Sequence, residues 1–97
     1  MPVHTLTTLQ HSEDRNGPFR LYIFDKAGYH RGGRWFRTGT PKYPDEEITI
    51  QKAKLEADEA VKKGFEVRIC DGGDMLVYHY RSGKVLYGEA FWKDLGQ

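Results

Sequence analysis

Helical periodicity in the middle of the chain is the feature that most constrains its fold. Between residues 49 and 64, small and apolar residues recur at spacings of three, four and seven, which is typical of one buried helix face. Thr49 precedes this stripe as the preferred N-cap, with Asp45 as the alternative, and Gly64 ends the helix. Because three of the six stripe positions are alanine, we expect the helix to lie close against a sheet. The stripe consists of Ile50, Ala53, Ala57, Ala60, Val61 and Gly64.

The residues before this helix predict a β-hairpin. Residues 19–24 are rich in β-branched and aromatic side chains, and residues 25–28 carry turn-forming residues. A second strand is expected within residues 29–38, where the Gly32-Gly33 pair favours a bulge or a longer hairpin loop. Residues 39–45 contain two prolines and therefore predict a connection rather than a central strand.

After the helix the apolar pattern returns to a period of two, which predicts three short strands. The segments are residues 65–70, 75–80 and 85–87 as strands, residues 71–74 and 81–84 as turns, and residues 89–95 as a short C-terminal helix. The order β-β-α-β-β-β predicts an α+β fold: a mainly antiparallel sheet of about five strands with the helix packed on one face.

Two strand-and-turn segments resemble each other at an offset of 46 residues. Residues 19–28 (FRLYIFDKAG) align with residues 65–74 (FEVRICDGGD), and each reads as a strand that leads into an aspartate-containing turn. Either a duplication or the shared requirements of a strand and a hairpin explain the similarity.

Size and composition predict one domain in a reducing compartment. With 97 residues, 38% hydrophobic and 30% charged, the chain can build one core but not two. Residues 1–18 are polar and aperiodic, so we expect a flexible or loosely docked segment before a single α+β domain over residues 19–97. The amino terminus shows no signal-peptide pattern, the apolar runs are too short for a bilayer, and the single Cys70 excludes an internal disulfide. These features favour a cytoplasmic protein without membrane contact.

Charge divides the chain into a basic first part and an acidic remainder. Residues 1–44 carry seven Lys/Arg against three Asp/Glu, and the remaining residues carry eight against eleven. Carboxylates cluster at residues 45–47, where the helix begins, and at Glu56, Asp58 and Glu59 on the helix face opposite the alanines. We interpret both clusters as solvated surface. The second cluster would also suit a basic partner or imitate a nucleic-acid phosphate track.

No sequence motif indicates catalysis, a cofactor or a metal. Phosphate-binding loops, paired cysteines and the common hydrolase and metalloprotease motifs are missing. Cys70 and His79 could face each other across neighbouring strands as nucleophile and base, but no third orienting residue is evident, so ordinary strand residues are the simpler interpretation. The histidines His4, His11, His30 and His79 show no ligand spacing. We therefore expect no catalytic residue, no metal and no cofactor.

The most suggestive surface segment is the hairpin region of residues 29–43, which combines arginines, aromatic residues and glycines. Arginines supply forked hydrogen bonds, aromatic rings supply flat stacking surfaces, and glycines let a ligand approach the backbone. The same residue types occur in exposed structural hairpins, in protein-binding hot spots and in nucleic-acid sites. The candidate partner-binding residues are Tyr29, His30, Arg31, Arg34, Trp35, Arg37 and Lys42.

Aromatic residues are also expected on the sheet face away from the helix, where several of the six tyrosines would join Phe24. One helix cannot cover both faces of a five-stranded sheet. Either the terminal Phe91-Trp92 segment covers the second face, or a partner does, in which case a homodimer is one option.

These features predict a non-enzymatic protein-binding module. A regulator or inhibitor of the kind that phages and mobile elements encode, docking on a larger protein assembly, would suit a small domain without catalytic motifs. A nucleic-acid-binding module using the basic aromatic hairpin 29–43 is the alternative, and it predicts an affinity that falls steeply with salt.

Overall fold

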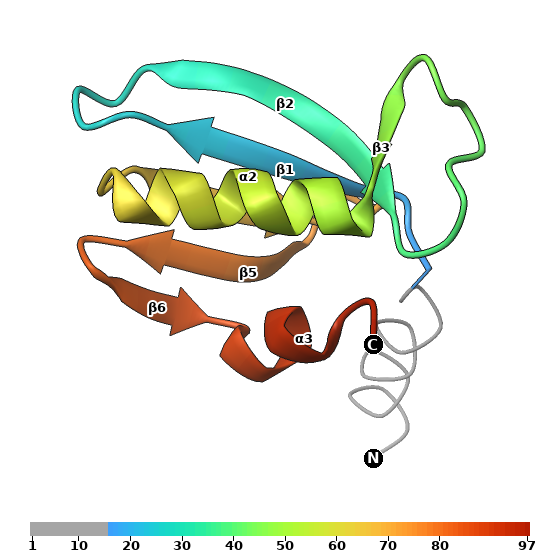
Figure 1. The fold of residues 1–97 in the computed structure, drawn as a ribbon. Coiled ribbons are helices and arrows are strands. Elements are labelled where there is room, and N and C mark those ends of the chain that lie inside the picture. The colour runs from blue at the N-terminus through green and yellow to red at the C-terminus, as the bar shows by residue number, and fades with distance from the viewer. Residues whose placement is uncertain (1–15) are drawn as a thin grey trace.

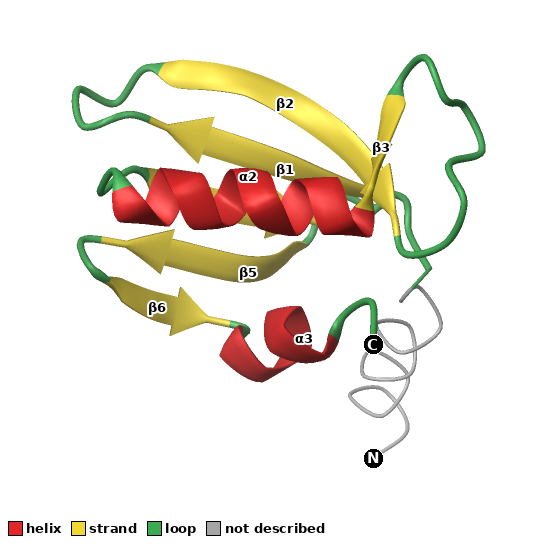
Figure 2. Ribbon diagram, viewed as in Figure 1, coloured by secondary structure: helices red, strands yellow, loops and turns green. Residues whose placement is uncertain are grey.

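The computed structural model describes residues 16–97 and shows an α+β fold built on one six-stranded sheet (Figures 1 and 2). The elements are β1 (Phe19–Phe24), β2 (His30–Arg37), β3 (Glu47–Thr49), α2 (Ile50–Lys62), β4 (Glu66–Cys70), β5 (Leu76–Arg81), β6 (Lys84–Tyr87) and α3 (Glu89–Asp94). The strand order is β3-β2-β1-β4-β5-β6, and all neighbouring strands are antiparallel except β2 and β3. The predicted fold class and both predicted helices are confirmed. Most of the predicted lead-in of residues 1–18 lies outside the described residues.

A sixth strand, β3, distinguishes the sheet from the predicted one. It pairs in parallel with the end of β2, and Trp35 lies opposite Glu47. Residues 45–47 were expected to be solvated surface at a helix start, but the Glu47 side chain is buried. Three residues are too few to show a periodicity, and the strand is recognisable only once β2 lies beside it.

Helix α2 begins and ends where its capping residues predict. The Thr49 hydroxyl accepts a hydrogen bond from the Lys52 amide at 3.1 Å. At the other end, the Gly64 amide donates to the Val61 carbonyl and the Phe65 amide donates to the Ala60 carbonyl, the pair of bonds that defines a Schellman motif. Neither described helix has the length and hydropathy needed to cross a bilayer.

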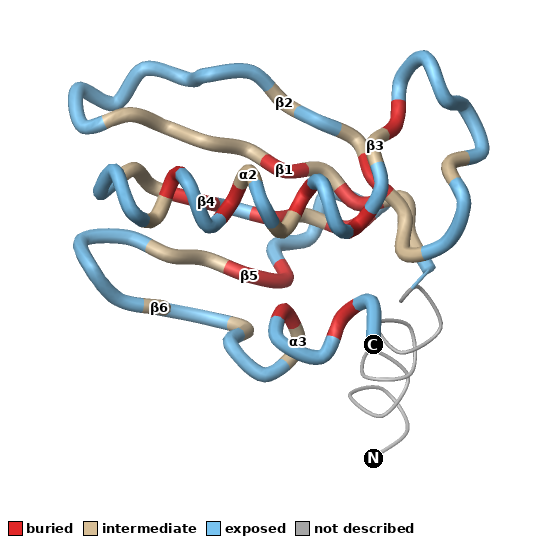
Figure 3. Tube along the Cα trace, viewed as in Figure 1, coloured by how far each residue is buried: buried red, intermediate tan, exposed pale blue. Residues whose placement is uncertain are grey.

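The hydrophobic core lies between the sheet and the two helices, as the buried segments in Figure 3 show. The rings of Phe19 and Phe36 stack with centroids 5.5 Å apart beneath the helices. Trp92 of α3 packs edge-on against Phe36 and lies 5.6 Å from the Tyr78 ring. The buried core side chains are Phe19, Leu21, Phe36, Ile50, Ala53, Ala57, Ala60, Val67, Ile69, Val77, Tyr78, Trp92 and Leu95.

Helix α3 packs on the same face of the sheet as α2. The ammonium group of Lys54 in α2 lies 4.3 Å from the Trp92 ring centroid, and it donates a hydrogen bond to the Trp92 carbonyl. Of the two alternatives that the sequence left open for the second sheet face, coverage by the Phe91-Trp92 segment is therefore wrong. No described element between residues 16 and 97 packs over that face.

The two hairpins that resemble each other in sequence also share their turn geometry. The Asp25 carboxylate accepts hydrogen bonds from the amides of Ala27 and Tyr29, two and four residues later. The Asp71 carboxylate accepts the equivalent bonds from Gly73 and Met75. Because β1 and β4 pair antiparallel at the centre of the sheet, the hairpins are related by an approximate twofold axis, which passes between Tyr22 and Arg68.

Gly88 joins β6 to α3 in a backbone conformation that leaves no space for a side chain. Its φ is +77°, and a Cβ atom there would lie 1.9 Å from the Val77 carbonyl oxygen. The Gly88 carbonyl also accepts the Trp92 amide at 3.0 Å, so a shift of this residue would displace the ring that closes the core.

We expect Gly88→Ala to lower the free energy of unfolding by about 3 kcal/mol or more, because the left-handed backbone strain and the backbone clash add. Gly83→Ala is the matched control: its φ is +85°, but no atom lies within 4 Å of the added Cβ, so about 1 kcal/mol is expected. Urea unfolding of both variants measures the difference. Equal losses would contradict the proposed clash.

Candidate functional site

The uncovered face of the sheet gathers aromatic rings and charged groups from five strands. Its position follows from strand alternation, since Leu21 and Ile23 point toward the helices whereas Arg20, Tyr22 and Phe24 point away from them. We call this surface the open face. It consists of Arg20, Tyr22, Phe24, His30, Trp35, Glu66, Arg68, His79 and Tyr87.

Cations and rings alternate across the open face. The Arg20 guanidinium lies 4.9 Å from the Trp35 ring centroid and 5.5 Å from that of Tyr22. Arg68 lies 5.2 Å from the Phe24 ring in the same manner. The His30 ring lies 5.5 Å from Tyr22 and 5.2 Å from Phe24, and so closes the gap between the two aromatic positions of β1. The result is a continuous layer of neighbouring rings and guanidinium groups, partly exposed to solvent.

Gly33 makes room for the Arg20 side chain. A Cβ atom at this position would lie 2.5 Å from Nε of Arg20, so the guanidinium lies directly over the Gly33 backbone. The register between β1 and β2 shifts just beyond this point, which confirms the bulge predicted from the Gly32-Gly33 pair. Glycine in this strand therefore positions an arginine from the neighbouring strand.

Arg20 is the cation on the open face whose charge has no partner among residues 16–97. Its Nε atom is buried and makes no hydrogen bond. An unsatisfied buried donor costs about 1–3 kcal/mol, so the ring contacts must hold the side chain in this orientation. The two terminal nitrogens form no hydrogen bond with a described residue, and the Arg20 side chain is partly exposed.

Glu66 neutralises the other arginine of the open face. Its Oε2 atom accepts hydrogen bonds from Arg68 Nε at 2.8 Å and from His79 Nε2 at 2.6 Å. Burial by itself raises the pKa of the Glu66 carboxyl, but the bonds from His79 and Arg68 outweigh it and leave the pKa below its ordinary value. At neutral pH the Glu66 carboxyl is therefore ionised and paired within the chain.

The structure divides the predicted partner-binding residues between the two faces of the sheet. His30, Trp35 and Arg37 lie on the open side. Arg34 lies opposite the buried Leu21 on the helix side, where it forms a 3.4 Å ion pair with Glu56 of α2. A strand that alternates its side chains cannot present consecutive residues to one partner.

The remaining predicted residues lie at the ends of β2. Tyr29 is exposed in the β1–β2 turn, and Arg31 forms a loose ion pair with Asp25 at 3.7 Å. Lys42 follows the other end of the strand, with its ammonium group 5.6 Å from the Tyr43 ring. The predicted segment thus contributes to three separate regions rather than to one continuous ribbon.

Four residues of the open face were not among the predicted site residues although they carry most of its charge: Arg20, Glu66, Arg68 and His79. The alternation of residues 19–24 is a signal that could have placed Arg20 beside Tyr22 and Phe24 on one face. The other three join them only because β4 and β5 lie next to β1, and that neighbourhood is a property of the tertiary fold.

A second cluster adjoins the open face at the start of β3. The buried Glu47 carboxylate accepts two hydrogen bonds from Arg37 Nε, at 2.8 and 2.9 Å, and one from the Lys42 amide at 2.7 Å. Its residues border a cleft of about 220 Å³ whose apolar walls include Pro18, Trp35 and Tyr43. Trp35 therefore belongs to both the cleft and the open face.

Among the described residues, neither the suggested nucleophile–base pair nor a metal-binding group is formed. Cys70 lies opposite Leu76, and His79 lies opposite Arg68, so the suggested nucleophile–base pair is not formed. Burial, followed by the nearby Asp74 charge, raises the pKa of the Cys70 thiol and disfavours the reactive thiolate. Among residues 16–97 no three His, Cys, Asp or Glu side chains form a metal-binding group.

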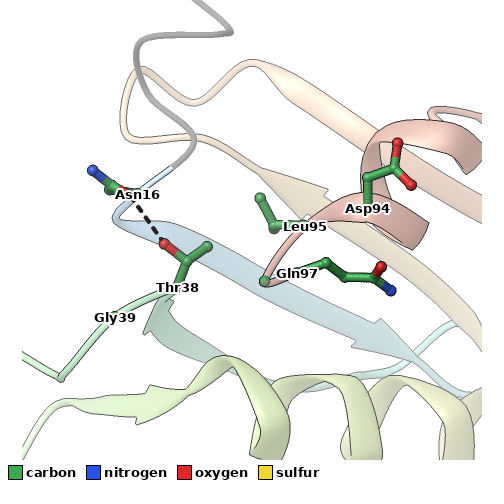
Figure 4. Close-up of a pocket in the computed structure, with 7 residues that line it drawn as sticks. Asn16, Thr38, Gly39, Asp94, Leu95 and Gln97 are labelled. Carbon is green, nitrogen blue, oxygen red and sulfur yellow. Dashed lines mark hydrogen bonds between the residues drawn. The ribbon is translucent and has the colours of Figure 1, made fainter.

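A hollow lies away from the open face, near the end of α3 (Figure 4). It has a volume of about 350 Å³, and Thr38 and Gly39 line one side of it. A hydrogen bond of 3.2 Å joins the Thr38 hydroxyl to the Asn16 side chain at its rim. Asp94 is the one ionisable side chain among its lining residues.

Comparison with known proteins finds no matching family model, no similar curated protein and no similar solved structure. Function is therefore argued from the geometry of this chain alone.

The Glu47 cluster predicts a pH-dependent contribution to stability. Burial by itself raises the pKa of the Glu47 carboxyl. Hydrogen bonds from the Lys42 and Tyr43 amides and from Arg37 lower this pKa by more than burial raises it, so the folded-state pKa lies below the ordinary value of 4.5. A depressed folded-state pKa stabilises the protein above the unfolded value, and the effect is lost as pH falls through the folded value.

We expect Glu47→Gln to lower the urea midpoint at neutral pH, and the gap from wild type to narrow as pH falls below 4.5. Urea titrations at neutral and acidic pH measure the gap. Glu46→Gln is the control because that neighbouring side chain is exposed, and its midpoint should follow wild type throughout. A gap at Glu47 that is independent of pH would contradict the assignment.

Proposed function

We propose that this protein is a non-enzymatic protein-binding module that docks on a larger protein through its open face. The observation that carries the proposal is that both described helices pack on one side of the sheet, which leaves the half-exposed rings of Tyr22, Phe24 and Trp35 on the other. Aromatic residues and arginine are the residue types enriched at the energetic centres of protein interfaces.

The charge arrangement favours a protein partner over a nucleic acid. A phosphate backbone is bound by several free cations along one track. Here Arg31, Arg34 and Arg37 each form an ion pair within the chain, and they do not share one face. Arg68 is paired with Glu66 as well. An interface of stacked rings with mostly paired charges fits protein association better.

A regulator or inhibitor of a larger assembly, of the type that phages and mobile elements encode, is the role we propose for such a module. The support for this step is the small size of the domain together with a recognition surface and no described catalytic arrangement. The surface would add its contacts to the partner as a preformed sheet, with little ordering needed on binding.

The central test uses Tyr22→Glu, which introduces a charge in the middle of the open face. Tyr22 lies opposite Arg68, so the new carboxylate has a cross-strand partner and the fold should be retained. We expect retention of the partner from an extract of the source cells to fall about tenfold or more. Leu55→Glu is the matched control, because Leu55 is 54% exposed on the helix side.

The capture is made after nuclease treatment and at both low and high salt, and circular dichroism checks that both variants fold. Loss with Tyr22→Glu and retention with Leu55→Glu supports docking through the open face. Equal capture by the two variants would contradict it. If nuclease treatment abolishes capture, the function is nucleic-acid binding instead. If only this chain is recovered and its mass in solution is that of a dimer, the open face binds a second copy of the chain.

A further inference from the structure

We propose that the partner presents an acidic side chain to Arg20, so that this residue is a carboxylate receptor at the centre of the docking surface. The inference rests on the proposed function and goes beyond it by naming the chemistry of the group that the open face recognises. It is carried by three observations: the way Arg20 is held, the part of it that is left free, and the pairing of the charges around it.

The guanidinium of Arg20 is held in place before any partner arrives. Trp35 lies 4.9 Å away on one neighbouring strand, Tyr22 lies 5.5 Å away on its own strand, and Gly33 provides the space beneath it. Rings on two sides restrict the rotamers of a long side chain, and less conformational entropy is then lost when a ligand binds. The terminal nitrogens are therefore positioned rather than mobile.

The free part of Arg20 is the end that a carboxylate needs. Nε is buried against the strand, whereas no hydrogen bond or ion pair joins the two terminal nitrogens to any described residue, and the side chain as a whole is partly exposed. A carboxylate can accept two parallel hydrogen bonds from such a planar fork, and this geometry is specific for arginine over lysine.

When a partner covers the open face, the positive charge of Arg20 needs an anion from that partner. Arginine does not lose its proton in proteins, so a partner that removes water from Arg20 must supply a counter-charge or leave a buried charge unpaired. The arginines Arg31, Arg34, Arg37 and Arg68 already lie 2.8–3.7 Å from carboxylates of this chain. Arg81 is also without an ion pair among the described residues, but it is exposed at the β5–β6 turn.

The cleft beside the open face indicates which kind of residue lies next to the acidic residue in the partner. Trp35 is shared between Arg20 and the cleft of about 220 Å³, whose other apolar walls are Pro18 and Tyr43. This volume suits a single apolar side chain. We therefore infer a partner segment in which an aspartate or glutamate lies near an apolar residue, with the acid on Arg20 and the apolar group in the cleft.

A random-peptide display library is the probe, selected on the full chain, on Arg20→Gln and on Arg34→Gln. Arg34→Gln is the matched control because it removes the same charge from the other side of the sheet. We expect wild type and Arg34→Gln to enrich peptides with an acidic residue at one fixed position beside an apolar one, and Arg20→Gln to lose that acidic preference. An enriched peptide is then synthesised in its acidic form and in the corresponding amide form.

The two peptide forms are titrated against wild type and Arg20→Gln. We expect the acid-to-amide change to weaken binding to wild type about tenfold or more and to leave binding to Arg20→Gln nearly unchanged. Arg20→Lys should recover only part of the preference. An equal loss with both proteins, enrichment of purely apolar peptides, or no enrichment on wild type would each overturn the inference.

Arg20-dependent binding of a random single-stranded oligonucleotide would also overturn it, because the recognised anion would then be a phosphate. These results can be separated from failure of the proposed function. Selective loss of cellular capture by Tyr22→Glu reports docking through the open face, including any contribution from Arg20, which lies 5.5 Å from the Tyr22 ring. The peptide pair reports only the chemistry at Arg20, so docking can be supported while the acidic preference fails.

Discussion

The close packing of an alanine-faced helix on one side of the sheet is the constraint on which the rest of this structure depends. Ala53, Ala57 and Ala60 let α2 lie against β1 and β4, and Trp92 of α3 closes the same layer beside it. Because both described helices pack on one side of the sheet, the apolar side chains of the core are buried on that side. The second side of the sheet is then left to half-exposed rings and charges, which is where a function that depends on contact is expected to lie.

That second side is organised by pairing rather than by free charge. Glu66 accepts hydrogen bonds from Arg68 and His79, and Glu47 accepts them from Arg37, so each carboxylate neutralises an arginine that would otherwise add to a basic track. Arg20 differs because its contacts are aromatic, and rings orient a guanidinium without cancelling its charge. Because Arg20 is held in place but has no ion-pair partner among the described residues, the open face can select a partner by charge. The rings around Arg20 can supply most of the binding affinity.

Some parts of the fold and the site could be predicted from local patterns, and other parts could not. The caps of α2 were predictable because Thr49 and Gly64 act within a few residues of their own position. Strand β3 was not predictable, because Glu47–Thr49 is held by β2 and by the Arg37 contact. The likeness of residues 19–28 to residues 65–74 proved to include the aspartate hydrogen bonds of both turns, which either duplication or common hairpin requirements still explain.

The sequence by itself determined the fold class, the limits of the central helix and the positions of the two aspartate turns, because each depends on periodicity or on hydrogen bonds between near neighbours. Only the tertiary structure decided which face α3 covers and which cations remain unpaired. It also showed that Arg34 and Trp35, although adjacent in the chain, serve opposite sides of the sheet. The physical reason is that strand alternation separates neighbours in sequence, while strand pairing brings Arg20, Trp35 and Arg68 together from three different strands.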